Sequence, residues 1–274
     1  MKTLLILFLI TSCTVFSQTK PLHLKGQIGK YKIVMEISSR DYVTGELAGK
    51  YNYKGKTNHL TLTGKTYNDL FVLDESYEGE HTGTFYLDTK GDSVVGKWIQ
   101  NETWHEVKLI RTSGDWDMIH CKSLDEYHME VNEDLSGVYA TESYFINDMW
   151  FQEDRPQIEV GYNGGVMILE PIHKDSMRFY IQLICGPTYH FATAGGVAVR
   201  NDSIFIYTNE DGCEISISTQ LNNRTVLVVA NDSQECGFGA RAYMNHSLIK
   251  VSNEIPEGEE INLNVLLGRE PQRK

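Results

Sequence analysis

The sequence predicts an all-β protein made of two antiparallel domains. Short runs of β-branched and aromatic residues alternate with turns rich in Gly, Asn, Asp and Lys along most of the chain. Glycine also stands two positions before an aromatic residue in four places, at Gly49-Lys-Tyr51, Gly83-Thr-Phe85, Gly96-Lys-Trp98 and Gly137-Val-Tyr139. This repeat is typical of curved antiparallel sheets, in which glycine permits a bend and the aromatic ring packs over it.

The chain begins with Met1-Lys-Thr and an apolar run over residues 4–10. This pattern predicts an export signal that is too short to remain as a membrane span. Ile10-Thr-Ser-Cys13 resembles a bacterial lipobox, which would make residues 1–12 the signal and Cys13 the lipidated first residue. Val15-Phe-Ser17 instead fits an ordinary cleavage site after residue 17. We therefore expect an outer-membrane lipoprotein anchored through Cys13, or a periplasmic or secreted protein.

The chain is acidic, with 25 basic and 37 acidic residues and a formal charge of -12. Such a balance argues against nucleic acid and against an anionic membrane surface as partners, and it favours a basic protein. Membrane contact is expected only through the lipid anchor at Cys13. No pattern in the sequence calls for a cofactor or a metal.

The first domain is predicted to span residues 20–112. Eight short runs, with turns between them, predict a meander that closes into a small barrel or a curled sheet. These runs cover residues 22–28, 30–37, 43–53, 59–64, 70–74, 83–88, 93–99 and 104–110. Along the last run, His105 shares a face with Val107 and Leu109, so it is either a core histidine or a ligand contact.

Residues 113–126 break the strand rhythm and are predicted to link the domains. Asp115, Asp117, His120 and Cys121 are closely spaced and of metal-ligating types. Because no second cluster accompanies them, an ordinary linker is the favoured interpretation and no metal site is predicted.

The second domain is predicted to span residues 127–252. Strands are expected at 137–145, 157–162, 166–172, 177–185 and 191–199, followed by a three-stranded meander from Ile204 to Val228. Gly161-Tyr-Asn-Gly-Gly165 is predicted to be a hairpin link, and Ala194-Gly-Gly196 a backbone bend. The tail, residues 253–274, is expected to form an edge strand or to be disordered.

The cysteines suggest that a disulfide holds the second domain. If Asn222 and Asn223 form the tip of a hairpin, Cys213 lies opposite about Asp232, and Cys236 can fold back toward it. A Cys213–Cys236 bridge is therefore expected, and the alternative is two free buried thiols.

Cys121 and Cys185 would then form a second pair, although spacing alone does not choose among the three connectivities of four cysteines.

The later part of this domain resembles exported bacterial proteins of the lysozyme-inhibitor-like group. The resemblance rests on Gly186-Pro-Thr-Tyr-His190, Gly196-Val-Ala198, Gly212-Cys-Glu-Ile215 and Cys236-Gly-Phe-Gly-Ala-Arg-Ala242. It implies an exported β domain held by a disulfide. The chain lacks the Thr-Lys-Gly inhibitor loop and has Phe191 where these proteins often carry a cysteine.

Three functions follow from these observations. The first is a noncatalytic module of the cell envelope that binds a basic protein such as a lysozyme, with His190, Arg241 and His105 as candidate binding residues. The second is a small-ligand carrier that uses the first barrel. The third is a hydrolase, for which candidate residues can be named although no recognisable motif joins them. These are His190, Asp202, Asp211, Ser203 and Ser216.

Overall fold

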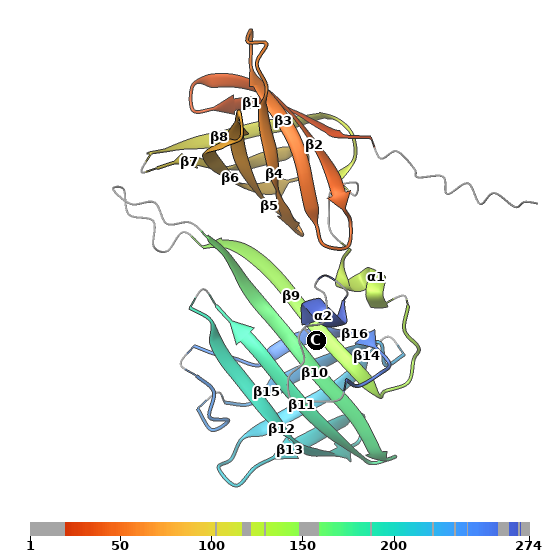
Figure 1. Cartoon of the computed structure of the whole chain (residues 1–274). Coiled ribbons are helices and arrows are strands. Elements are labelled where there is room, and N and C mark those ends of the chain that lie inside the picture. Colours follow the sequence, from red (N-terminus) through yellow and green to blue (C-terminus); the bar gives the residue numbers. More distant parts are fainter. Residues whose placement is uncertain are drawn as a thin grey trace, which may run out of the picture.

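Two closed antiparallel barrels follow one another along the chain (Figure 1). The computed structural model describes residues 20–101, 103–116, 122–128, 130–147, 159–186, 188–220, 222–232, 234–239, 241–256, 263–267 and 269. Residues 1–19, which include Cys13, lie outside the described residues, as do Asp117, His120 and Cys121. The prediction of an all-β protein with two antiparallel domains is confirmed.

The first barrel is an eight-stranded meander. Its strands are β1 (Leu22–Ile28), β2 (Tyr31–Asp41), β3 (Glu46–Tyr53), β4 (Leu60–Tyr67), β5 (Leu70–Tyr77), β6 (Glu80–Lys90), β7 (Ser93–Gln100) and β8 (Thr103–Ser113). Each strand pairs with the next, and β8 returns to β1 with Leu109 opposite Gly26. The sheet is therefore a closed barrel.

Side chains fill the interior of this barrel. On β2, Ile33, Met35 and Ile37 are buried, whereas Val34 between them is 43% exposed. Phe71 and Phe85 from the facing strands are completely buried. The period of two in the sequence thus separates an apolar interior from a solvated wall, as in small barrels whose centre is packed.

The second barrel also has eight strands. They are β9 (Gly137–Asn147), β10 (Glu159–His173), β11 (Ser176–Cys185), β12 (His190–Asn201), β13 (Ile204–Thr208), β14 (Glu214–Gln220), β15 (Thr225–Ala230) and β16 (Asn245–Ser252). β9 pairs with β10 on one side and with β16 on the other, which closes the barrel.

Strand β10 corrects one prediction. The glycines at 161–165 do not form a hairpin link, because β10 runs through them without interruption. Gly165 has a φ of 151°, and a Cβ placed there would lie 2.0 Å from the Gln182 carbonyl oxygen of β11. Glycine at this point bends a long strand and lets the neighbouring backbone approach closely, so the same residues that suggest a turn can serve a continuous strand.

Strand β16 is not among the predicted strands, because its buried positions are not all apolar. Lys250 is fully buried. Its ammonium group donates to Asn132 Oδ1 at 3.0 Å and also to the Asp134 carbonyl. Burial lowers the pKa of Lys250, and these oxygens provide the polar partners that a buried ammonium requires.

The predicted Cys213–Cys236 disulfide is present, with a sequence separation of 23 residues. Cys185 is a buried free thiol whose Sγ lies 3.3 Å from the Tyr243 carbonyl oxygen. Its expected partner, Cys121, lies outside the described residues.

Two short helices lie beside the second barrel, α1 (Leu124–His128) and α2 (Leu263–Leu266). Helix α2 lies in the tail, where an edge strand or disorder was the expectation. Leu267 is buried with Leu124 and Tyr127 of α1. Arg269 donates to both carboxylate oxygens of Glu142 on β9, at 2.7 and 2.8 Å, and this pair is almost fully buried. The tail is therefore attached to the wall of the second barrel.

The barrels meet through one end of the first barrel (Figure 1). The Lys122 amide donates to the Tyr42 carbonyl in the β2–β3 turn at 2.8 Å. The Tyr67 ring lies 5.3 Å from that of Tyr144 on β9. The opposite end, which carries the β1–β2 and β3–β4 turns, points away from the second barrel. Among the described residues, no helix has the length and apolarity needed to cross a membrane.

Candidate functional site

A cluster of aromatic rings lies inside the first barrel near its outer end. Tyr51, Phe85 and Trp98 are the aromatic members of three Gly-x-aromatic repeats, and all three are buried. The Tyr51 and Phe85 rings meet edge to face at 5.5 Å. A Cβ on Gly83 would lie 2.7 Å from Trp98 Nε1, so glycine is needed there. The repeat therefore brings large rings together, edge to face or tilted, in one part of the barrel.

A buried carboxylate lies among these rings. Glu75 on β5 is 2% exposed. It accepts hydrogen bonds from the Tyr51 hydroxyl at 2.6 Å, Trp98 Nε1 at 2.8 Å and the Thr82 hydroxyl at 2.6 Å. Burial, reinforced by the bond to Glu75, raises the pKa of Tyr51 far above its usual range. The carboxylate thus holds two aromatic side chains in fixed positions.

Tyr53 connects this buried network to the solvent. Its hydroxyl oxygen lies 3.4 Å from that of Tyr51. Its ring centroid lies 5.6 Å from Tyr51 and 5.9 Å from Tyr31 at the start of β2. Three tyrosines therefore lead from the packed core to the barrel mouth.

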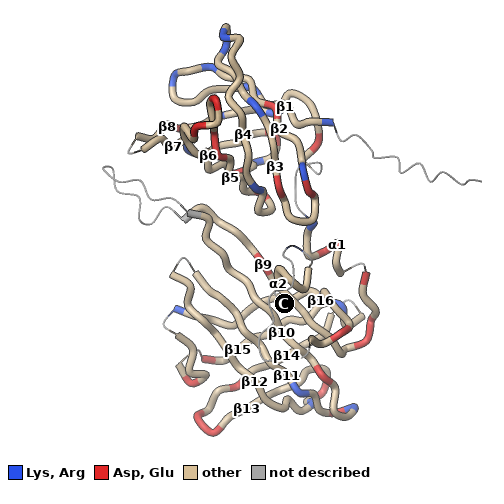
Figure 2. Tube along the Cα trace, viewed as in Figure 1, with Lys and Arg blue, Asp and Glu red and all other residues tan. Residues whose placement is uncertain are grey.

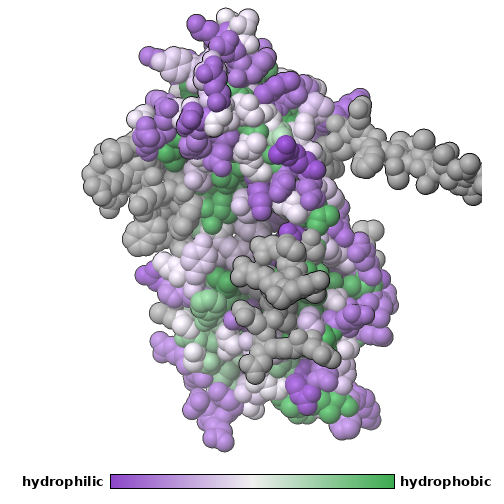
Figure 3. Space-filling model, viewed as in Figure 1, coloured by the Kyte–Doolittle hydropathy of each residue, from purple (hydrophilic) through white to green (hydrophobic). Residues whose placement is uncertain are grey.

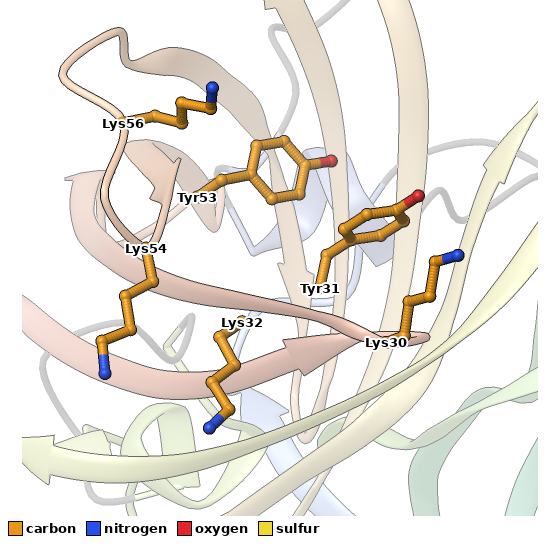
Figure 4. A pocket seen from close by; sticks show the side chains of 6 residues that line it. All are labelled: Lys30, Tyr31, Lys32, Tyr53, Lys54 and Lys56. Atoms are coloured by element: carbon orange, nitrogen blue, oxygen red, sulfur yellow. The ribbon is translucent and has the colours of Figure 1, made fainter.

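An open pocket of about 530 Å³ lies at this mouth. The Tyr31 and Tyr53 rings meet in it at an interplanar angle of 79°. Lys30 and Lys56 lie beside the rings, whereas Lys32 and Lys54 point away from them (Figure 4). Its lining residues are Lys30, Tyr31, Lys32, Tyr53, Lys54 and Lys56. Hydrophilic residues dominate the surface at this end of the molecule (Figure 3). The volume suits one small molecule, since ligand sites commonly measure about 300–1,000 Å³.

Several basic positions lie along the chain at the outer end of the first barrel (Figure 2). Residues 20–113 carry 13 basic and 12 acidic side chains, whereas residues 114–274 carry 11 and 25. The strong negative charge of the chain therefore belongs to its second half. The first barrel is close to neutral overall and concentrates four lysines at its outer end.

His105 lies near this site without lining the pocket. Its ring stacks on Trp98 at 5.9 Å with an interplanar angle of 4°. Its Nδ1 lies 3.5 Å from the Cβ position of Gly29, in the β1–β2 turn. It shares the inward face of β8 with Val107 and Leu109 but is only partly buried. His105 therefore supports the aromatic cluster from the side.

His190 and Arg241 lie at one end of the second barrel. His190 begins β12, opposite Cys185. The following residue, Phe191, accepts a backbone hydrogen bond from Gly239 at 3.1 Å, which brings the segment before Arg241 to the same end. Both residues are described, and the structure records no hydrogen bond or ion pair between them.

The hydrolase residues do not form one cluster. His190 and Asp202 stand at the two ends of β12, which spans His190–Asn201. At about 3.3 Å per residue, that strand separates them by roughly 40 Å. Ser203 adjoins Asp202, and the Ser216 hydroxyl donates to the Val229 carbonyl at 3.3 Å. The fold therefore does not bring His190 together with Asp202 and Ser203 in one site.

The lining residues of the first-barrel mouth are absent from the sequence-based candidates. One signal that could have indicated them is Glu75, which shares its face of β5 with the buried Leu73 and is an acidic residue at an inward position. The other is the density of Lys and Tyr in the two neighbouring turns. Comparison of the chain with protein-family models and with curated proteins gave no match.

Proposed function

We propose that this protein is an exported, noncatalytic binding protein of the cell envelope that holds a small molecule at the mouth of its first barrel. The observation that carries the proposal is the pocket built on the Tyr31 and Tyr53 rings. Tyrosine offers a flat apolar surface at low entropic cost, so a ligand with a planar apolar body fits it. The packed core beneath keeps the ligand at the mouth.

The buried network strengthens this site. The Glu75 carboxylate fixes Tyr51, which in turn contacts the Tyr53 ring and hydroxyl. A binding surface that is already in place before the ligand arrives loses less entropy on binding.

Binding of the neutral fluorescent probe phenylnaphthylamine tests this proposal. We expect saturable binding to the intact protein, and at least about tenfold weaker binding to the Tyr53→Ala variant, because the variant loses one of the two rings that form the apolar part of the pocket. Tyr189→Ala, an exposed tyrosine of the second barrel, is the matched control and should bind normally. Equal probe affinities of the Tyr53→Ala and Tyr189→Ala variants would contradict a binding site at Tyr53.

A basic protein is the second candidate partner, favoured by the charge of the second barrel. Asp211 and Glu235 line an open pocket of about 430 Å³ beside the disulfide at Cys236. Lysozymes are the natural test, since the sequence resemblance points to them. We expect the protein to lower the lytic activity of a lysozyme at low salt, and this inhibition to disappear at moderate salt. Unchanged activity at every salt concentration would remove this candidate.

Export and anchoring form part of the same proposal. The apolar run at residues 4–10 and the segment ending in Cys13 support them. Metabolic labelling with a fatty-acid precursor should label the protein, and Cys13→Ser should abolish the label. Secretion of an unlabelled wild-type protein would favour cleavage after residue 17.

A further inference from the structure

The mouth of the first barrel combines two tyrosine rings with four lysines. We propose that its ligand is a small organic acid, whose flat apolar body stacks on one of the Tyr31 and Tyr53 rings against the edge of the other, and whose acidic group lies among the lysines. This inference rests on the proposed function and adds the charge of the ligand. Carboxylate, sulfonate and phosphate groups share the required chemistry, since each accepts hydrogen bonds from ammonium donors.

The pocket lysines differ from other lysines of the same barrel. Lys50, Lys90 and Lys108 each pair with a carboxylate, at 3.5, 3.6 and 2.8 Å. The four pocket lysines form no ion pair with any carboxylate in the described part of the chain. Lys30 lies over the Tyr31 ring, with its ammonium 5.4 Å from the centroid. Their charge is therefore available to a ligand.

The backbone that carries these lysines is fixed. The Lys54 amide donates to the Lys32 carbonyl at 2.8 Å, and the Lys56 amide donates to the Tyr53 carbonyl at 2.9 Å. The Asn52 side-chain amide donates to the Lys56 carbonyl at 3.2 Å, which ties the β3–β4 turn to the strand before it. The lysines thus start from set positions, and their side chains reach outward in different directions (Figure 4).

The position of the mouth protects it from the acidic half of the molecule. It lies at the end of the first barrel that points away from the second barrel (Figure 1). Strands such as β2, with 11 residues, place roughly 35 Å of sheet between the two ends. Charges interact weakly beyond about 8 Å at physiological salt. An anion at the mouth therefore meets the local lysines and little of the distant negative charge.

A small acid also fits the site better than an anionic membrane surface. A lipid surface needs a broad exposed basic face, whereas these lysines line one open pocket together with two tyrosine rings. The first barrel as a whole is nearly neutral, with 13 basic and 12 acidic side chains. Attraction to a large charged surface would therefore be weak.

Two probes of the same shape test the inference with the full protein. Anilinonaphthalene sulfonate carries one negative charge, and phenylnaphthylamine is its neutral counterpart. Both are titrated into wild-type protein, into Lys54→Gln/Lys56→Gln, and into Lys65→Gln/Lys90→Gln. The last variant removes the same charge from positions nearer the opposite end of the barrel. All four substituted lysines are exposed, so the fold should be retained.

We expect wild-type protein to bind the sulfonate about tenfold more tightly than the neutral probe, and Lys54→Gln/Lys56→Gln to lose most of that preference. The control variant should keep it, and added salt should weaken sulfonate binding only. Equal affinities of the wild type for both probes would overturn the charge assignment and leave the tyrosine site standing. Binding of neither probe would overturn both proposals. Tight pelleting with anionic vesicles, but no binding of the free sulfonate, would assign the lysines to a lipid surface instead.

Discussion

The two barrels have the same number of strands but are held together differently. In the first, each strand pairs with its neighbour in sequence, and no described residue of that barrel is a cysteine. The second depends in addition on links between distant parts of the chain, including the Cys213–Cys236 disulfide and the pair of Arg269 with Glu142. The first barrel is therefore held by pairing between neighbouring strands, and one of its ends faces away from the second barrel. The second barrel has additional cross-links between distant parts of the chain.

The barrels also differ in charge. The acidic excess lies in residues 114–274, whereas residues 20–113 are close to neutral and collect lysines at the outer mouth. The length of a barrel thus separates the lysines at the outer mouth from the acidic part of the chain.

Of the changes that separate the two barrels, loss of the contact between the tail and the second barrel should cause the largest loss of unfolding free energy. Glu142→Ala leaves the Arg269 guanidinium in a nearly buried position without its carboxylate. We expect the second barrel to lose about 3–5 kcal/mol of unfolding free energy, measured by urea denaturation. Glu170→Ala, which removes an exposed pair with Arg178, should cost under about 1 kcal/mol. Similar losses in both variants would contradict the structural role of the tail.

Reduction of the disulfide should destabilise the second barrel selectively. The bridge closes a loop with a sequence separation of 23 residues, for which the chain-entropy model gives about 3 kcal/mol. Cys213→Ser/Cys236→Ser should therefore lower the unfolding midpoint of the second barrel, followed by near-ultraviolet circular dichroism. Probe binding at the first barrel should not change. A parallel loss of probe binding would show that the barrels are not independent.

Removal of the buried carboxylate should affect the first barrel in turn. Glu75→Ala leaves the Tyr51, Thr82 and Trp98 donors without their acceptor, which should cost about 2 kcal/mol. We also expect weaker probe binding, because Tyr51 no longer fixes Tyr53. The neighbouring Asp74→Ala changes an exposed carboxylate and serves as the control. Normal probe affinity in the Glu75→Ala variant would show that the hydrogen bonds of Glu75 do not support the binding site.

The smallest expected effect is a pH dependence of the second barrel. Burial lowers the pKa of His246 below its ordinary value of 6.5. The unfolded chain therefore binds a proton more readily than the folded one, and stability falls as the pH drops below about 6.5. His246→Asn should reduce the difference between unfolding free energies at pH 8 and pH 5.5. The exposed His59→Asn should not, and an equal change in both would contradict the assignment.

The fold was largely predictable because both barrels obey a period of two. That period marks inward residues such as Ile33 and Met35 on β2, and the Gly-x-aromatic repeat marks where the sheet curves. Strand β16 escapes the rule because Lys250 occupies a buried position, with partners more than a hundred residues away in sequence. The closure of the second barrel could not be predicted without it.

The candidate site was harder to predict for a similar reason. Tyr31, Tyr53 and Glu75 come from three different strands, and Glu75 is linked to the tyrosines through Tyr51, a contact that forms only when the barrel folds. Periodicity shows that Glu75 points inward but not which donors surround it. His105, by contrast, was placed on the correct face of its strand, and its contact with Trp98 required the structure.

The most direct test of this account is an amide NMR titration of the full protein with anilinonaphthalene sulfonate. We expect chemical-shift changes to concentrate on residues 29–32 and 51–56 of the first barrel and to leave the second barrel unaffected. Changes centred on the second barrel, or scattered over the molecule without saturation, would contradict a ligand site at the first-barrel mouth.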